Sequence, residues 1–492
     1  MTEAKYMGII GAALMLTGTC QGVSWGAPVP AGVEQNEAGE NLQREQQERQ
    51  EEAARRNGEI NLKKIVVPIE QVEIHADGKM TEREIRYILP ELYRKNGQVR
   101  IHRLAQQLQM ANESGAAVFH ADFHDSAVPG KLAVTLTVKE LPSQHGAITV
   151  SNTGNEYTGD WRTTASFIQS NLSSRLDSLG VAWVTSPEKF TDVQQGALSY
   201  RYMTPKTLGT WNLNASYSNV DLGNIASSNL AGILEYTAKG QGTNVGLHYQ
   251  KHLAYTAKER DSWDFGIDYQ RSNSKYSITF QAFIPFTDAW TQDYHVTTAS
   301  VDFQHLERGR QHVFYWDAGV ASSLDNAGKN YQAVTPGSDN QFTAFRGNLI
   351  YQYRTKTNWI FGTRWQGQYT QQHLVSLAQL GVGGARTVRG FYERAISADK
   401  GILGNVEIYT PEICRGLRLL TFVDFASLAN NLNANTNTFG NERIASAGLG
   451  LRYTNEKSGL GISLDYAKII DDVEGTRDGS YRRWNVNCSY KF

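Results

Sequence analysis

The sequence predicts an all-β transmembrane barrel of about sixteen antiparallel strands, preceded by a small α+β domain and a charged N-terminal helix. Apolar and polar side chains alternate through the last residues, 481–492, as in a strand with lipid on one face and water on the other. The alternation recurs from about residue 147, and the large aromatic side chains share the face of the aliphatic ones. No run of 18 or more apolar residues occurs, so the sequence predicts no membrane-spanning helix.

The composition argues against several classes of function. The 492 residues include 48 basic and 49 acidic ones, so the chain has no net positive field to attract nucleic acid. Neither an H-E-x-x-H metal motif nor a phosphate-binding loop is present. An S-x-x-K spacing, from Ser272 to Lys275, lies at a strand end without a partner motif, and we attribute it to chance. We therefore expect no catalytic, metal-binding or cofactor-binding residues and no enzyme activity.

Residues 1–26 resemble a secretory signal peptide. They contain a basic start, an apolar stretch of small residues and a small-x-small cleavage site before Ala27. The residues before Cys20 fit a lipoprotein signal poorly, which disfavours a lipid anchor there. After cleavage Cys414 and Cys488 remain, and we interpret them as two unpaired small residues rather than a disulfide framework.

Residues 34–57 form a strongly charged segment. They are rich in helix-forming residues, with many Glu/Arg pairs three or four positions apart. Almost none of them is apolar, so a helix here cannot pack on a hydrophobic core. Two interpretations stay open: a solvated or disordered linker, and a helix that lies in a polar channel and plugs it. Gly58 ends the segment, and residues 58–65 link it to the next domain.

Residues 66–141 predict a small α+β domain in the order β-α-α-β-β. Thr81 begins the first helix through a capping box with Glu84. This order matches a polypeptide-transport-associated (POTRA) domain, and the chain has room for one. Such a domain leaves a sheet edge beside a helix, where an extended peptide can add a strand. The expected elements are a strand at 67–74, a helix with Ile85, Ile88, Leu89 and Leu92 on one face, a helix with Ile101, Leu104, Leu108 and Ala111, and strands at 118–123 and 132–138.

Residues 147–492 are predicted to form the barrel itself. In one representative strand Trp211, Leu213 and Tyr217 share a face, while the residues between them are polar. A soluble β-sandwich would also alternate, but it has fewer and shorter strands with polar outer faces. The final residue, Phe492, resembles the insertion signal of outer-membrane barrels. We therefore expect outer-membrane lipid and the barrel assembly machinery among the partners.

A long connection separates the predicted eleventh and twelfth strands, from about His373 to Asp399. It contains the glycine-rich stretch 381–393, GVGGARTVRGFYE, whose glycines allow tight backbone turns. Loops of this length are uncommon in compact domains and are usually functional or disordered. We therefore treat this connection as the candidate functional segment.

Two motifs in this region resemble those of a known superfamily. The stretch VRGF at 388–391 resembles the Val-Arg-Gly-Tyr/Phe motif on the sixth extracellular loop of the POTRA-barrel outer-membrane superfamily. The stretch FVDFA at 422–426 resembles its Phe-x-Asp-x-Gly motif on the thirteenth strand, with Ala426 in place of the glycine. The superfamily loop folds inward and its arginine pairs with this aspartate. The site residues that the resemblance implies are Val388, Arg389, Gly390 and Phe391 on the loop and Phe422 and Asp424 on the strand.

Within the superfamily, the sequence is most similar to two-partner secretion transporters of the hemolysin-activator and filamentous-hemagglutinin-secretion type. The similarity covers the charged helix, the linker, the POTRA domain and the strands. Members usually carry two POTRA domains, whereas this chain has room for one, which leaves the mode of client recognition open.

The resemblance implies a transporter in the outer membrane of a Gram-negative-type cell, with the POTRA domain in the periplasm. Its partner would be an unfolded exoprotein, hemolysin- or adhesin-like, whose N-terminal secretion domain binds the POTRA domain before the chain threads the barrel. No bond is made or broken. A barrel assembly or insertion factor of the same superfamily is the alternative, although such factors usually carry more POTRA domains. A passive porin would lack both the POTRA domain and the charged helix.

Overall fold

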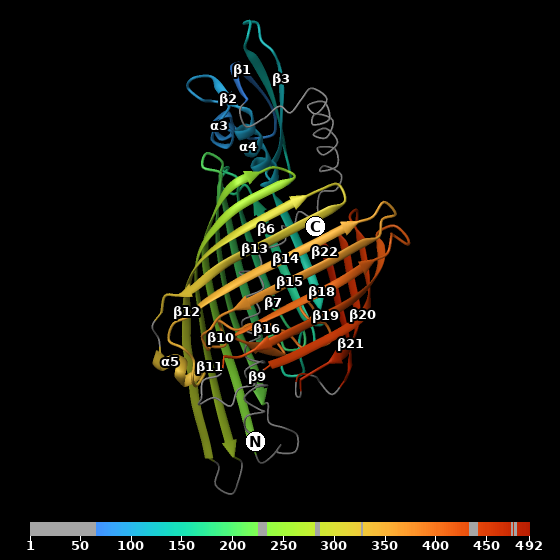
Figure 1. The fold of residues 1–492 in the computed structure, drawn as a ribbon. Coiled ribbons are helices and arrows are strands. Elements are labelled where there is room, and N and C mark those ends of the chain that lie inside the picture. Colours follow the sequence, from blue (N-terminus) through green and yellow to red (C-terminus); the bar gives the residue numbers. More distant parts are fainter. Residues whose placement is uncertain are drawn as a thin grey trace.

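The computed structural model describes residues 65–224, 234–280, 286–325, 328–431, 441–473, 476 and 480–492. The predicted signal peptide (1–26), the charged segment (34–57) and all of the 58–65 linker except Ile65 therefore lie outside the described residues. The described residues form an N-terminal α+β module that sits against one end of a closed barrel (Figure 1). Their helices are all too short or too polar to cross a bilayer.

The N-terminal module is a four-stranded sheet in the order β2-β1-β4-β3, with helices α3 and α4. Strands β1 and β4 run parallel, whereas β3 and β4 run antiparallel. The observed order follows the expected β-α-α-β-β pattern except for β2, a three-residue strand that pairs with the start of β1. The elements are β1 (Val66–Asp77), α3 (Glu82–Ile88), β2 (Gln98–Arg100), α4 (Ile101–Glu113), β3 (Ala117–Asp125) and β4 (Leu132–Glu140).

Helix α3 is shorter than its apolar pattern suggests. The capping box between Thr81 and Glu84 is present at its start. The helix ends at Ile88 because Leu89 precedes a proline, and a residue in that position disfavours the helical backbone. Leu89 and Leu92 are nevertheless buried in the module core, in the turn that follows the helix.

The barrel has sixteen strands, and every neighbouring pair is antiparallel, as the sequence predicts. The last strand pairs with the first, and the backbones of Phe492 and Gly146 exchange two hydrogen bonds at this seam. The strands are β5 (Gln144–Ser151), β6 (Arg162–Ser170), β7 (Asp177–Thr185), β8 (Val193–Thr204), β9 (Gly209–Asn224), β10 (Leu234–Tyr255), β11 (Glu259–Phe280), β12 (Phe286–Arg308), β13 (His312–Ser323), β14 (Thr343–Arg354), β15 (Ile360–Tyr369), β18 (Lys400–Tyr409), β19 (Leu417–Ala429), β20 (Asn441–Asn455), β21 (Leu460–Asp471) and β22 (Arg482–Lys491).

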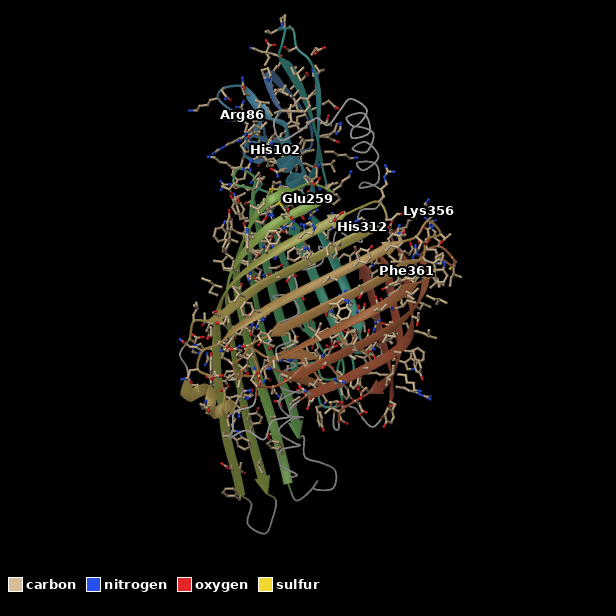
Figure 2. The ribbon with its side chains drawn as sticks, in the orientation of Figure 1. Arg86, His102, Glu259, His312, Lys356 and Phe361 are labelled. Carbon is tan, nitrogen blue, oxygen red and sulfur yellow. The ribbon has the colours of Figure 1, made fainter. Side chains whose placement is uncertain are left out.

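The side chains of the barrel wall alternate between two environments. Phe265 and Ile267 lie on the outer surface and are about half exposed, as expected of residues that contact lipid. Their neighbours Asp264 and Asp268 point inward and are buried. Figure 2 shows His312, the first residue of β13, and Lys356, in the turn after β14, toward the end of the barrel nearer the module.

The strands differ greatly in length. Strand β12 has 23 residues, whereas β5 has 8. A tilted strand needs only roughly 9–11 residues to cross a bilayer. In Figure 1 strands β10, β11 and β12 extend past the rest of the barrel at the end opposite the module. These three strands therefore form a ribbon that continues beyond the wall of the barrel.

The module is fastened to the near end of the barrel. Its core continues into the near end of the barrel through four residues, two in turns and two at strand ends, which are Leu176, Leu208, Met203 and Tyr255. The Glu113 carboxylate, at the end of α4, accepts hydrogen bonds from the Tyr255 hydroxyl at 2.7 Å and from the Arg260 guanidinium. The Arg103 side chain donates to the Lys206 carbonyl at 2.9 Å. Helix α4 thus supplies these contacts with the barrel, and α3 adds one between the hydroxyls of Tyr87 and Tyr202 on β8.

Candidate functional site

The connection between β15 and β18 folds back into the barrel. It carries a short hairpin of β16 (Leu380–Val382) and β17 (Ile396–Ala398), with its tip at 383–395. The apolar side chains of this lumenal hairpin pack on inward-facing residues of the barrel wall, in one buried cluster. The members of the cluster are Leu380, Val382, Val388, Phe391, Ile396 and Ala398 of the hairpin and Leu403, Ala426, Leu428, Ile444 and Ile469 of the wall.

The structure brings Arg389 and Asp424 together. Arg389 donates from Nε to Asp424 Oδ2 and from Nη2 to Asp424 Oδ1, both at 2.7 Å. The backbone amide of Arg389 also donates to Asp424 Oδ2, at 3.0 Å. Only 4% of the Arg389 side chain and none of the Asp424 side chain is exposed. Two parallel bonds of this kind fix the orientation of the guanidinium as well as its position.

Two further carboxylates approach the same guanidinium. Arg389 Nη2 lies 2.8 Å from Glu407 Oε1 on β18, and Nη1 lies 3.7 Å from Asp465 Oδ2 on β21. Asp465 is shared with Arg452, which donates two bonds to it at 2.7 and 2.9 Å. The centre of the Arg389 guanidinium lies 3.4 Å above the Phe422 ring, a cation–π contact. Two arginines are therefore paired with three carboxylates of low exposure at this site.

The sequence analysis did not single out Glu407, Asp465 or Arg452. Asp465 belongs to a polar strand face that the alternation assigns to the lumen, so its direction could be read from the sequence. The height of Asp465 along the barrel axis could not be read from the sequence, because it depends on the stagger between neighbouring strands. Glu407 pairs in register with Phe422, and only this pairing reveals that it reaches Arg389.

Backbone geometry at the tip requires glycine at one motif position. Gly390 has a φ of +100°, a conformation that side-chain-bearing residues rarely adopt. A Cβ atom at this residue would lie 3.2 Å from the Ile469 side chain on β21. Val388 and Phe391 on either side are buried in the apolar cluster. The VRGF stretch is therefore pressed directly against the inner wall.

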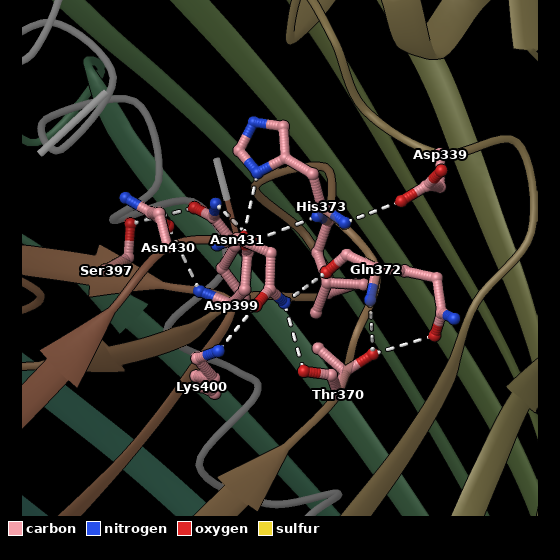
Figure 3. A network of polar contacts seen from close by, with 12 residues as sticks. Asp339, Thr370, Gln372, His373, Ser397, Asp399, Lys400, Asn430 and Asn431 are labelled. Carbon is pink, nitrogen blue, oxygen red and sulfur yellow. Dashed lines mark hydrogen bonds and ion pairs between the residues drawn. The ribbon is translucent and has the colours of Figure 1, made fainter. Parts of the chain in front are cut away.

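The base of the hairpin is fixed by a second polar network (Figure 3). The fully buried carboxylate of Asp399 accepts backbone hydrogen bonds from Leu374 at 2.8 Å and from Asn431 at 2.7 Å. The His373 ring Nδ1 lies 2.8 Å from the same carboxylate. The Asn431 amide donates to the carbonyls of Thr370 and Gln372 at 3.0 and 2.8 Å. Both the tip and the base of the hairpin are thus tied to the barrel.

A cavity of about 1860 Å³ lies inside the barrel. It extends from the junction with the module, at Glu113 and Pro142, to the hairpin, at Arg386 and Arg394. Between them its wall carries many polar side chains, including Asp302, Gln304 and Asn348. Over the described part of the chain, no cluster of His, Cys, Asp or Glu has the arrangement of a metal site. The cavity thus runs along the inside of the barrel from the module to the hairpin, and many polar side chains line it.

Phe492 lies apart from this site. It stands at the seam between β22 and β5, is 67% exposed, and its ring stacks 6.1 Å from that of Tyr490. The structure therefore brings six of the seven predicted site residues together inside the barrel, around the Arg389–Asp424 pair. It places the seventh, Phe492, on the rim that faces the module.

Comparison with known proteins gives both a family and similar folds. A model of the family described as haemolysin secretion/activation protein ShlB/FhaC/HecB matches residues 130–453. No curated protein sequence matches the chain. Among solved structures, CdiB from Escherichia coli has a TM-score of 0.68 at 15% identity, covering 87% of this chain and 77% of that one.

Two further structures have related folds. CdiB from Acinetobacter baumannii has a TM-score of 0.69 at 14% identity, covering 87% of this chain and 74% of that one. BamA from Haemophilus ducreyi, solved without POTRA domains 1–3, has a TM-score of 0.53 at 15% identity, with 87% and 85% covered. At these identities the likeness establishes the fold alone.

Proposed function

Because the chain belongs to the haemolysin secretion/activation protein family ShlB/FhaC/HecB, we propose that it exports an unfolded exoprotein, which its N-terminal module binds and its barrel conducts. The family comprises non-enzymatic outer-membrane channels of two-partner secretion. The chain is accordingly an outer-membrane transporter whose partner is a secreted protein. Binding by the module and threading through the barrel are the parts that we propose.

The observation that carries the proposal is the inward-folded hairpin. It stands between a polar cavity that begins at the module and the opposite end of the barrel. A polypeptide that crosses the barrel must therefore pass or displace the hairpin that Arg389 and Asp424 hold. We propose that the six motif residues keep the hairpin in one defined position against the wall, so that passage remains controlled.

Strand β3 of the module is suited to bind the client. Among the described residues it pairs with β4 alone, so its other edge is available for strand addition. The Asn112 side chain satisfies both the amide and the carbonyl of Phe119 on that edge, at 2.6 and 3.2 Å. By the two-residue period of a strand, Ala121 and Phe123 present their backbone groups on the same side. We propose that residues 66–141 act as a POTRA domain and that this stretch of edge takes up the client.

The first experiment identifies the client and tests the function together. The gene is deleted in its own bacterium, and the proteins of the culture medium are compared by mass spectrometry. We expect one exoprotein to disappear from the medium and to return on complementation. An unchanged medium would reject the proposed function.

Two variants then separate recognition from insertion. Removal of residues 66–141 is expected to abolish export while the barrel still enters the outer membrane. Removal of Phe492 is expected instead to lower the amount of heat-modifiable barrel, if this residue is the insertion signal read by the assembly machinery. Normal export by the isolated barrel would rule out recognition by the module, and normal barrel levels without Phe492 would place the signal elsewhere.

A further inference from the structure

Two basic side chains face outward from neighbouring strands at the end of the barrel opposite the module. Lys468 on β21 and Arg482 on β22 are register partners, and both are exposed. Two residues further along, Tyr466 and Trp484 are register partners on the same outer face, and Trp484 is 54% exposed. Because β22 ends beside Phe492 on the rim that faces the module, its start at Arg482 lies at the opposite end (Figure 1).

Lys468 and Arg482 lie at the boundary of the lipid layer. Each follows a run of apolar and aromatic residues on the outer face of its strand. The run consists of Leu460, Ile462, Leu464 and Tyr466 on β21 and of Tyr490, Cys488, Val486 and Trp484 on β22. The Tyr466 and Trp484 rings lie 4.8 Å apart, as in the aromatic girdle that marks the edge of the hydrocarbon layer. With the module in the periplasm, the two cations stand at the level of the headgroups of the outer leaflet.

The two positive charges stand directly opposite each other without a carboxylate between them. Directly opposed residues of antiparallel strands have Cβ atoms roughly 4.5–5.5 Å apart, and like charges in these positions destabilise the pairing. Within the described residues, neither Lys468 nor Arg482 has an ion-pair partner. Asp471, three positions further along β21, forms no ion pair with either of them. The chain therefore leaves a local excess of positive charge on this face.

The corresponding cation on β11 is neutralised by the protein itself. There the outward series of Phe265, Ile267 and Tyr269 ends at Arg271. The Arg271 guanidinium donates from Nε to Asp293 Oδ1 at 2.9 Å and from Nη2 to Oδ2 at 2.5 Å. The same step from apolar to basic residues on β21 and β22 has no such partner, so an anion from outside the chain would relieve the repulsion there.

The neighbouring strand leaves room for a headgroup beside Lys468. On β20 the register partner of Lys468 is Ala447, and the next outward residue is Ala445. These small side chains do not cover the Lys468 ammonium group from that side. Towards the membrane, the outward residues Leu464 and Val486 continue as an aliphatic surface against which acyl chains can pack.

We propose that Lys468 and Arg482 bind the phosphate group of a phosphorylated glycolipid of the outer leaflet. An ammonium and a guanidinium both donate to phosphate oxygens, and the guanidinium can do so through two parallel bonds. The Tyr466 and Trp484 rings and the aliphatic residues below them contact the acyl part of the same molecule. That contact favours a lipid over a free anion as the occupant. The site depends on the location of the barrel in the outer membrane and not on the export of a client.

The site adjoins the part of β22 that contacts the lumenal hairpin. Arg483, next to Arg482, faces inward, and its guanidinium lies 4.3 Å from the centre of the Tyr392 ring at the hairpin tip. Arg483 also donates to the Gly154 carbonyl at 3.2 Å. The register of β22 with β5 covers only Asn487 to Lys491 and does not reach this end of the strand. A phosphate that bridges β21 and β22 would thus stabilise the strand end on which the hairpin tip rests.

Titration of the purified full-length chain with phosphorylated lipid A, followed by native mass spectrometry, tests the site. For the double variant Lys468→Gln/Arg482→Gln we expect the dissociation constant to rise by a factor of roughly 10 to 100, as the loss of hydrogen bonds to charged groups predicts. Arg482→Lys keeps the charge and should lose less affinity than Arg482→Gln. The matched control, Lys356→Gln/Lys457→Gln, removes two exposed charges from turns at the module end and should bind as the unmodified chain does. Heat-modifiability checks that every variant is folded.

Two further probes identify the occupant. Dephosphorylated lipid A should bind the unmodified chain and the Lys468→Gln/Arg482→Gln variant equally weakly, and inorganic phosphate should not displace the phosphorylated lipid. Equal affinity of phosphorylated lipid A for these two proteins would overturn the inference. So would undiminished binding of the dephosphorylated lipid to the unmodified chain. Full displacement by inorganic phosphate would overturn it as well, because the two cations would then bind a free anion rather than a lipid.

Discussion

The hairpin tip and the N-terminal module are each held to the barrel by an arginine–carboxylate pair, but in different surroundings. Arg389 and Asp424 are 4% and 0% exposed, beside Glu407 and Asp465 and next to the apolar cluster of hairpin and wall. Arg260 and Glu113 are 15% and 22% exposed, at the junction of module and rim. Removing one partner of a buried pair leaves an uncompensated charge, which costs about 3–5 kcal/mol, whereas partly hydrated pairs cost less. Breaking the contact between the hairpin tip and the barrel should therefore cost more free energy than breaking the contact between the module and the barrel.

The largest effect is expected at the tip. Arg389→Ala leaves Asp424 buried without its partner, so we expect export to fall strongly while the barrel still inserts. Asp424→Ala should act alike, and the double variant should be little worse than either single one, because the two residues form one unit. The secreted exoprotein and the heat-modifiable barrel are the quantities to measure.

Arg418→Ala provides a control on the same strand as Asp424. Arg418 donates to the carbonyls of Thr410 and Asn358 at 2.9 and 3.1 Å, and its one carboxylate contact, with the exposed Glu412, is at 3.5 Å, so its loss leaves no buried charge. The variant should export normally. A cysteine pair at 389 and 424 should also crosslink under oxidation. Independent, additive losses in the single variants together with a failed crosslink would show that the tip is not held as described.

A smaller effect is expected at the module. Glu113→Gln weakens the bonds to Arg260 and Tyr255, at a cost of about 1–3 kcal/mol. We expect faster proteolysis at the junction with the barrel and a partial loss of export. Glu82→Gln disrupts a pair with Arg86 that is more than half exposed, and it should leave both quantities unchanged. Equal sensitivity of the two variants to protease would show that the Glu113 contacts do not hold the module to the barrel.

The charged segment 34–57 tests whether the hairpin alone closes the lumen. Its all-polar character motivates a position inside the channel at rest. Deletion is then expected to raise the single-channel conductance in planar bilayers, with the barrel still folded. Unchanged conductance would rule out a plug and leave closure to the hairpin.

The smallest effect is expected on the stability of the module at low pH. Burial alone would raise the pKa of the Glu91 carboxyl, but hydrogen bonds from the Arg100 side chain and backbone outweigh it and hold the pKa below its ordinary value. The folded module therefore binds this proton less readily than the unfolded chain, and the stabilisation present at neutral pH is lost as the pH falls through the folded pKa. We expect the thermal stability of the module to fall in acid, below about pH 4. Glu91→Gln should remove most of this pH dependence of the thermal stability. If the variant loses stability in acid as the unmodified module does, other carboxyl groups are responsible.

The sequence predicted the barrel well because its signal, a two-residue alternation, is local. The contact between Arg389 and Asp424 could be anticipated only through a resemblance, since the two lie 35 positions apart on different elements. The far half of β11 was not recognised as part of an extended ribbon. From Arg271 onward both of its faces are largely polar, so the alternation that identifies a membrane strand ends there. Strand β2 was missed because three residues are too few to show a period.

The seam of the barrel makes its closure depend on two strands that are far apart in the sequence. Strand β22 pairs with β5 through Asn487 to Lys491, and Phe492 completes the contact with Gly146. Ring closure thus joins the first strand of the barrel to its last. A barrel without β22 has two open strand edges, and unsatisfied backbone groups in hydrocarbon cost several kcal/mol each. A chain that lacks β22 therefore forms a sheet that cannot seal in the lipid.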